Sequence, residues 1–195
     1  MSPKTKASAA AGSSNRRPSP VSAHAEELGD LDEEQLALLL ELRPDLAEPA
    51  PASMDLIEKL ADEYEIALAI HNHPKPSSVY WDPAKVVEVT KGRSKRMGAC
   101  CDTGHWVRSG LAPVECLKKL EGRIIGMHLK DITEFGVVNA PDVPWGTGKG
   151  QIAAILAEVR RQKAKPVFAI EYERHGDTMP DLRQSIAFYE KTAQE

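Results

Sequence analysis

The sequence has few of the features that mark secreted, membrane or nucleic-acid-binding proteins. It holds three cysteines, and an odd count with two of them adjacent does not predict a disulfide framework. Its apolar runs, such as residues 66–70, are far shorter than the roughly 20 residues of a membrane-spanning helix. A net charge of -4 without a basic face argues against nucleic acid, and no apolar segment follows Met1. We therefore expect a soluble cytoplasmic protein with no membrane or nucleic-acid partner.

Charge is distributed unevenly along the chain. Residues 1–25 hold four basic residues and no acid and are rich in Ser, Ala and Pro, a composition that cannot bury enough apolar surface to order itself. The same composition is found in organelle transit peptides. Residues 26–48 hold nine acids against one arginine, and residues 32–43 have the apolar spacing of a short helix. We predict that residues 1–53 form a disordered tail with one short helix and a linker.

From residue 54 onward, helical and strand patterns alternate. Four apolar strands are expected at 66–71, 97–102, 124–128 and 167–171, separated by helices that begin near Met54, Pro83, Pro113 and Ile152 and followed by a last one at 181–192. Strands joined by helical crossovers pair in parallel. The pattern therefore predicts an α/β fold over residues 54–195 with a parallel sheet.

Each predicted strand ends in a side chain that can bind a metal ion. Each of these residues shares its strand face mainly with small residues, while bulkier ones point the other way. In a barrel the carboxyl ends of the strands converge on the active site, and a mixed nitrogen and oxygen ligand set suits manganese, cobalt, zinc or iron. A single strand-end His or Asp more often makes a hydrogen bond or a turn, so the repeated position carries the prediction. The predicted ligands of one divalent metal ion are His71, Asp102, His128 and Glu171.

Four sequence words resemble the xylose-isomerase-like TIM-barrel superfamily, and within it the sugar phosphate isomerases/epimerases. They are Ile70-His71-Asn72-His73-Pro74, Cys101-Asp102-Thr103-Gly104-His105-Trp106, Met127-His128-Leu129-Lys130-Asp131 and Ile170-Glu171-Tyr172-Glu173. The resemblance covers residues 54–195 and implies the C-terminal half of the barrel, strands five to eight. In that family a Glu, an Asp, a His and a second Glu hold the metal. Asp102, His128 and Glu171 match the last three, and the position of His105 implies contact with substrate hydroxyls.

The chain departs from this family pattern in two ways. His71 stands where the family has the glutamate of strand five, so one of the two carboxylates that move a proton is missing. Counterparts of strands one to four are not found in the first 53 residues. A half barrel exposes two sheet edges. We therefore expect self-association or a partner chain that completes the barrel.

The resemblance also suggests roles for residues near the strand ends. Trp106 and Trp145 follow strand ends and are candidates to line a sugar pocket. Gly146 belongs to the loop 144–150, whose N–H groups can hold a sugar oxygen or a phosphate, unless it is simply a flexible loop entering a helix. Lys130 is a candidate substrate-binding residue, with an ordinary surface charge as the equal alternative.

Together these features predict a metal-dependent isomerase or epimerase acting on a sugar, sugar phosphate or keto-sugar. The metal ion would stabilise an enediolate intermediate while a base shifts a proton. Glu171 is the candidate base, with His71, His73 or His105 as its partner. Two alternatives stay open: a truncated, non-catalytic remnant that binds sugar or metal, and a DNA-repair endonuclease on the same fold, which would need more metal ligands and a basic surface.

Overall fold

The computed structural model describes residues 51–192. Residues 1–50 of the predicted tail, with its short helix, lie outside them, whereas residues 51–53 belong to a helix. The centre of the structure is a four-stranded sheet in which every neighbouring pair is parallel, as expected. The strand order is β1 (Leu68–His71), β2 (Met97–Asp102), β3 (Ile124–Leu129) and β6 (Val167–Ile170). An α/β fold with successive parallel strands is therefore confirmed.

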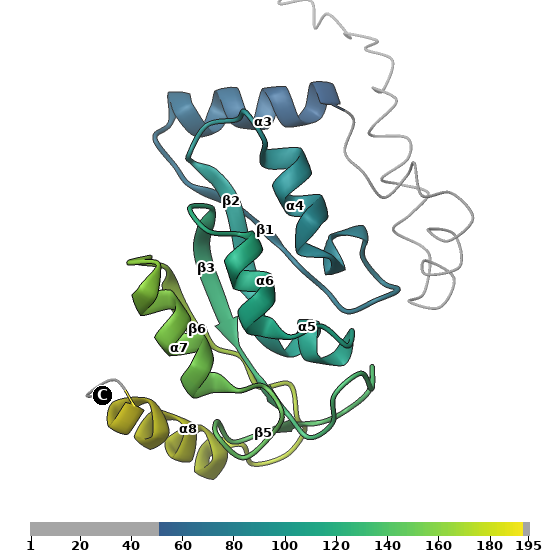
Figure 1. The fold of residues 1–195 in the computed structure, drawn as a ribbon, viewed down its shortest axis with the longest axis vertical. Coiled ribbons are helices and arrows are strands. Elements are labelled where there is room, and N and C mark those ends of the chain that lie inside the picture. The colour runs from purple at the N-terminus through teal and green to yellow at the C-terminus, as the bar shows by residue number, and fades with distance from the viewer. Residues whose placement is uncertain (1–50, 193–195) are drawn as a thin grey trace, which may run out of the picture.

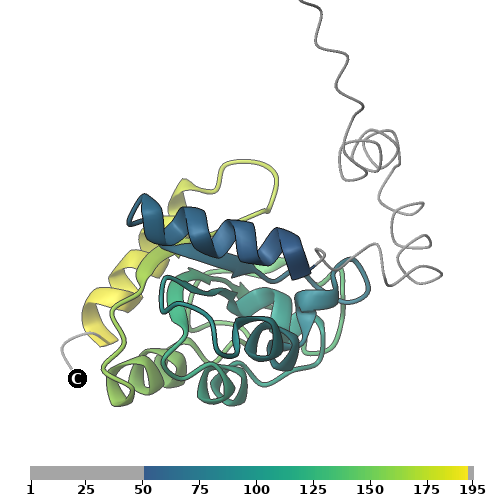
Figure 2. The same cartoon turned by 90° about the horizontal axis from the view of Figure 1, so that it is seen from above.

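Six α-helices accompany the sheet in the described part of the chain (Figure 1). They are α3 (Pro51–Glu63), α4 (Pro83–Thr90), α5 (Thr103–Arg108), α6 (Pro113–Lys119), α7 (Ile152–Arg161) and α8 (Met179–Thr192). Helix α3 crosses one end of the sheet, and α4, α6 and α7 cover one of its faces (Figures 1 and 2). A short 3-10 turn at Val79–Trp81 precedes α4. None of these helices is long and apolar enough to cross a membrane.

Local sequence explains where several helices begin. Asp82 accepts a hydrogen bond from the N–H of Ala84, and Pro83 takes the first helical position of α4. Asp102 ends β2 and at once caps α5, because its side chain accepts from the N–H of His105. The sequence pattern missed α5 and the small antiparallel pair β4 (Asp131–Ile132) and β5 (Asp142–Val143). All three are too short to show a periodic apolar pattern.

The two faces of the sheet have different neighbours. Cys101 and Met127, both fully buried, belong to the same core cluster as Leu117 of α6 and Ile155 of α7. The opposite face carries small residues, and a Cβ added at Gly126 would meet the Cys100 sulfur at 3.3 Å. The bulky face thus packs on helices, while the small face leaves room for the side chains at the strand ends.

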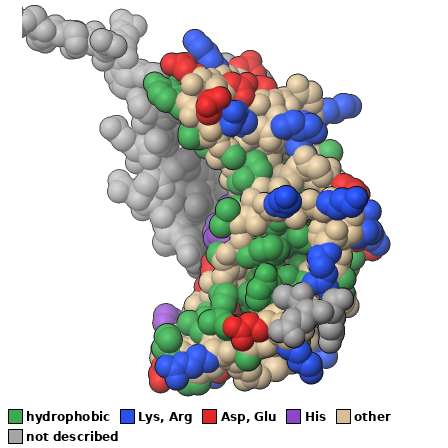
Figure 3. All heavy atoms as spheres, turned by 90° about the vertical axis from the view of Figure 1, so that its left-hand side faces the viewer, with side chains coloured by type: hydrophobic (Ala, Val, Ile, Leu, Met, Phe, Trp, Pro, Cys, Tyr) green, Lys and Arg blue, Asp and Glu red, His purple; other side chains and the backbone are tan. Residues whose placement is uncertain are grey.

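The outer strands β1 and β6 each have one strand neighbour within the described residues. Hydrophobic side chains gather on the side of the molecule where β6 lies (Figure 3). Val167 is 77% exposed and Phe168 is 37% exposed, although both are strand residues. The edge at β6 is therefore apolar as well as unpaired in the described part.

Candidate metal centre

Parallel register brings the four predicted ligands to one end of the sheet. His71 ends β1, Asp102 of β2 lies opposite His128 of β3, and Glu171 directly follows β6. Their nearest ligand atoms all lie within 4.8 Å of one another. Three of the side chains are about a third or less exposed, and that of Asp102 is fully buried. The cluster is thus open enough to admit a small ion and closed enough to hold it.

The polar atoms of this cluster fit a metal ion. Asp102 Oδ1 accepts a hydrogen bond from the N–H of His105 at 2.8 Å. Asp102 Oδ2 and His71 Nε2 make no hydrogen bond within the described residues, although the Lys130 ammonium lies 3.3 Å from Asp102 Oδ2. Asp102 Oδ2 and His71 Nε2 lie 3.7 Å apart, and His128 Nδ1 and Glu171 Oε2 contact each other beside them. Buried polar atoms without partners are costly. Two imidazoles and two carboxylates would satisfy them by holding a divalent ion.

The electrostatics of Asp102 keep a carboxylate available for binding. Burial by itself would raise its pKa, but the adjacent His71 and His105 imidazoles and the charge of Lys130 lower it to about 2. Asn72 fixes the backbone of Asp102, since its side chain donates to the Asp102 carbonyl and accepts from the Asp102 N–H. Asp102 is therefore ionised and rigidly placed at the centre of the cluster.

Cys100 offers an alternative ligand set, together with His71 and His128. Burial, followed by the charges of Asp102 and Glu171, raises the pKa of this thiol to about 11. The thiolate is the form that binds metals, so a raised pKa disfavours it. The carboxylate set is the better candidate.

Lys130 lies inside the site. From the sequence alone, an exposed surface charge was an equal alternative. The Lys130 side chain is fully buried, and its ammonium lies 2.9 Å from oxygens of Glu171 and Glu173 and 3.3 Å from Asp102. Burial opposes its charge, but these carboxylates raise its pKa overall. A buried lysine is rare unless it is paired in this way. Lys130 is thus a buried cation held beside Asp102, Glu171 and Glu173.

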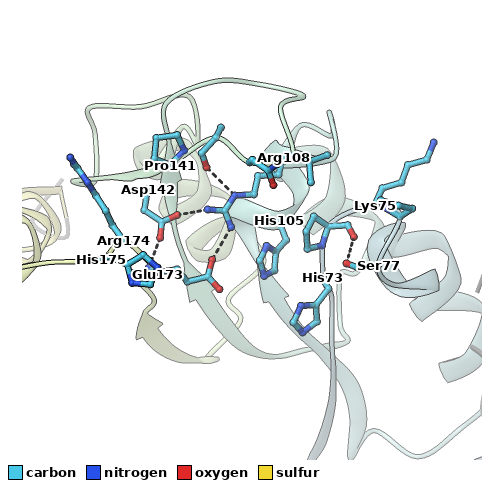
Figure 4. Close-up of a pocket in the computed structure, with 15 residues that line it drawn as sticks. His73, Lys75, Ser77, His105, Arg108, Pro141, Asp142, Glu173, Arg174 and His175 are labelled. Atoms are coloured by element: carbon cyan, nitrogen blue, oxygen red, sulfur yellow. Dashed lines mark hydrogen bonds and ion pairs between the residues drawn. The ribbon is translucent and has the colours of Figure 1, made fainter. Parts of the chain in front are cut away.

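His105 and His73 lie beside the cluster with their rings stacked, their centroids 5.1 Å apart (Figure 4). His105 is 3% exposed and its Nδ1 has no partner within the described residues. Burial and the charge of Lys130 lower its pKa to about 4, although Asp102 opposes this. His73 is exposed. The pair therefore joins a neutral buried imidazole to one in contact with solvent.

We expect the buried His105 to make the folded protein less stable in mild acid. Its folded pKa of about 4 lies below the ordinary histidine value of 6.5, so only the unfolded chain takes up a proton as pH falls between these values. The loss amounts to about 3 kcal/mol at pH 4. Urea unfolding in chelator-containing buffer from pH 7 to 4 measures it. Between pH 7 and 4, the free energy of unfolding of the His105→Gln variant should fall by about 3 kcal/mol less than that of wild type. Parallel curves of unfolding free energy against pH for the two proteins would contradict the prediction.

A cavity of about 1230 Å³ opens above the histidine pair. Arg108 crosses its wall and bonds to Asp142 and Glu173, each at 2.8 Å (Figure 4). Lys75 and Arg174 also line it. The sequence assigned no role to Arg108, Asp142 or Glu173. One signal was available for Glu173, since a residue two positions after Glu171 in an extended chain points to the same side.

Three of the predicted substrate-binding residues lie elsewhere. Trp106 and Trp145 are 1% and 3% exposed and belong to the hydrophobic core, where the Trp145 indole donates to the Leu129 carbonyl. The N–H of Gly146 donates to the carboxylate of Asp131 at 2.8 Å, as do those of Gly148 and Gly150 at 3.0 and 2.7 Å. The loop 144–150 thus binds an internal carboxylate, at the N–H groups where the sequence suggested a phosphate or sugar oxygen.

Comparisons with known proteins agree with this architecture. The model of the xylose isomerase-like TIM barrel family matches residues 44–192. No curated protein matches the chain.

Solved structures share the fold. A D-tagatose 3-epimerase-like protein is 21% identical with a TM-score of 0.62, and the match covers 74% of this chain and 53% of that one. An uncharacterized protein from Parabacteroides distasonis is 34% identical with a TM-score of 0.52, covering 83% and 65%. An IolI protein with a bound zinc atom is 15% identical with a TM-score of 0.60, covering 90% and 72%. The chain thus spans about half to two thirds of the first two structures.

Proposed function

Because the chain belongs to the xylose isomerase-like TIM-barrel family, we propose that it is a metal-dependent isomerase or epimerase of a sugar or keto-sugar. The observation that carries the proposal is the cluster of His71, Asp102, His128 and Glu171, with ligand atoms within 4.8 Å of one another and two of them without hydrogen-bond partners in the described residues. The structural similarity to a D-tagatose 3-epimerase-like protein and to an IolI protein with a bound zinc atom supports the proposal.

The residues around the cluster have the chemistry that such a reaction needs. A divalent ion bound here would polarise a carbonyl and stabilise the negative charge of an enediolate. The Glu171 carboxylate would remove the proton from the carbon next to the carbonyl. His73 would return a proton to the other face, because its ring is exposed and can exchange protons with water. Return to the same carbon gives an epimer, and return to its neighbour gives an isomer.

The surrounding side chains would orient the substrate. Lys130 holds Glu171 Oε1 at 2.9 Å and so fixes the direction of the base. His105, next to His73, would bind substrate hydroxyls. The cavity of about 1230 Å³ has room for a monosaccharide. A partner chain or a second copy bound at the β1 and β6 edges would close it further.

Solvent deuterium exchange tests this function. Wild-type protein in D₂O with manganese, cobalt, zinc or iron(II) should introduce deuterium next to the carbonyl of at least one member of a panel of ketoses and ketose phosphates, as read by NMR. The Glu171→Gln variant keeps the size of the side chain but loses the base, so its rate should fall by at least about 100-fold. An exposed-surface variant, Glu134→Gln, should match wild type.

The outcomes separate this function from the alternative of a non-catalytic remnant. Metal binding without exchange on any member of the panel would favour a sugar- or metal-binding remnant. Exchange that persists at the wild-type rate in Glu171→Gln would remove Glu171 from the proposed mechanism.

A further inference from the structure

Lys130 is surrounded by four polar atoms that come from β2, α5 and the segment after β6. Its ammonium lies 2.9 Å from Glu171 Oε1, 2.9 Å from Glu173 Oε2, 3.3 Å from Asp102 Oδ2 and 3.4 Å from His105 Nε2. The Lys130 side chain is fully buried. All four partners are groups that also bind metal ions, so the ammonium sits in a site built for a cation.

Three of these partners form a second candidate ligand set. His105, Glu171 and Glu173 place one ligand atom each within 4.8 Å of one another, the same spacing as in the main cluster. Glu171 belongs to both sets, through Oε2 on the His128 side and Oε1 on the Lys130 side. A carboxylate with one oxygen on each side has the geometry of a bridge between two adjacent cations.

The charges at the site set how many cations it needs. Four carboxylates, those of Asp102, Asp142, Glu171 and Glu173, face two fixed cations, Lys130 and Arg108. The histidines are counted as neutral. The net charge of about -2 that remains is neutralised by one divalent ion. Without the lysine charge, the net charge of these groups would be about -3, which favours binding of a second ion.

We propose that Lys130 is a built-in cation that takes the place of a second metal ion and keeps the centre mononuclear. Removal of its ammonium opens a metal site formed by His105, Glu171 and Glu173, with Glu171 shared between two ions. The inference rests on the proposed function for the first ion, but the second site depends on the four polar atoms around Lys130.

Metal stoichiometry measures the effect of Lys130. Protein freed of metal by chelator is titrated with zinc by calorimetry, and bound metal is counted by mass spectrometry after gel filtration. Wild type should bind one ion, whereas Lys130→Ala and Lys130→Gln should each bind two. The Gln variant keeps more of the side-chain volume and supplies the test if the Ala variant does not fold, as judged by circular dichroism. A double variant, Lys130→Gln with Glu173→Gln, should return to one ion.

Manganese adds a readout that a purely structural role of Lys130 would not change. Two Mn²⁺ ions bridged by Glu171 should give a spin-coupled electron paramagnetic resonance spectrum in Lys130→Gln, and wild type should give the signal of an isolated ion. A folded Lys130 variant that binds as many ions as wild type overturns the proposal. An added ion that survives the Glu173 substitution overturns it as well, because that ion is bound elsewhere.

The same titrations distinguish the two proposals. Wild type without any bound ion contradicts the proposed function, whereas a Glu173-dependent gain of one ion in Lys130→Gln still supports the role of Lys130. One ion in wild type and one in the variants leaves the proposed function in place and removes the second site.

Discussion

Replacing Asp102 by Asn is expected to abolish binding of a divalent ion. Asp102 is fully buried, and its Oδ2 lies 3.7 Å from His71 Nε2 and 3.6 Å from His105 Nε2, so its charge lies at the centre of the cluster. The Asn side chain can keep the cap on α5, because one oxygen can still accept from the N–H of His105. The fold should therefore survive while the affinity is lost.

The expected change appears in thermal or urea unfolding with and without metal. An ion that binds the folded state at 100 times its dissociation constant adds about 2.7 kcal/mol to the free energy of unfolding. Wild type should show this gain with manganese, cobalt or zinc, and Asp102→Asn and His128→Ala should show none. Glu115→Gln, on the exposed surface of α6, serves as a matched control. Equal binding by wild type and Asp102→Asn would remove the metal centre.

A substitution at His71 tests the same metal centre by a change that is expected to preserve binding rather than abolish it. His71→Glu supplies the carboxylate that the family resemblance places at the end of the first strand of this sheet. We expect it to retain metal binding and to raise any deuterium exchange activity, since a second carboxylate becomes available to move a proton. Loss of binding in this variant alone would show that the imidazole is needed at that position.

The placement of the four strand-end side chains could be predicted because it depends on two simple periodicities. Side chains alternate along a strand, and parallel strands joined by helices end at the same edge of the sheet. His71, Asp102, His128 and Glu171 needed no knowledge of packing beyond that. The structure adds their distances and the neighbours that orient them, such as Asn72 behind Asp102.

The surroundings of the cluster depend on contacts that local sequence does not encode. Trp106 points into the core because α5 begins directly after Asp102, and no periodic pattern marks a helix of six residues. Lys130 is buried because its three carboxylate partners come from β2 and from the segment after β6. Such partners meet only in the folded chain, so the sequence left a surface lysine equally possible.

Asp131 shows the same limit in the loop 144–150. Backbone N–H groups next to a helix start attract an anion, and the sequence cannot say whether that anion is a ligand or a side chain of the protein. The structure places the Asp131 carboxylate there, 1% exposed, with hydrogen bonds from the N–H groups of Ile132, Gly146, Gly148 and Gly150. The residue next to Lys130 therefore ties this loop to the end of β3.

Asp131→Ala is expected to cost about 3 to 5 kcal/mol of the free energy of unfolding. The substitution leaves four N–H groups without their acceptor, and an unsatisfied buried donor costs about 1 to 3 kcal/mol. Gly148 cannot readjust freely in this variant, since a Cβ added there would still lie 2.5 Å from the Ile132 carbonyl oxygen and 2.8 Å from Val143 Cγ2. Urea unfolding followed by circular dichroism measures the change.

Glu134→Ala is the matched control for this substitution. It removes a carboxylate three residues further along the same segment, but from an exposed position, so its effect should stay within about 0.5 kcal/mol. Asp131→Asn should fall between the two, because its amide keeps one oxygen acceptor and turns a donor toward the remaining N–H groups. A loss below about 1 kcal/mol for Asp131→Ala would mean that water satisfies these N–H groups.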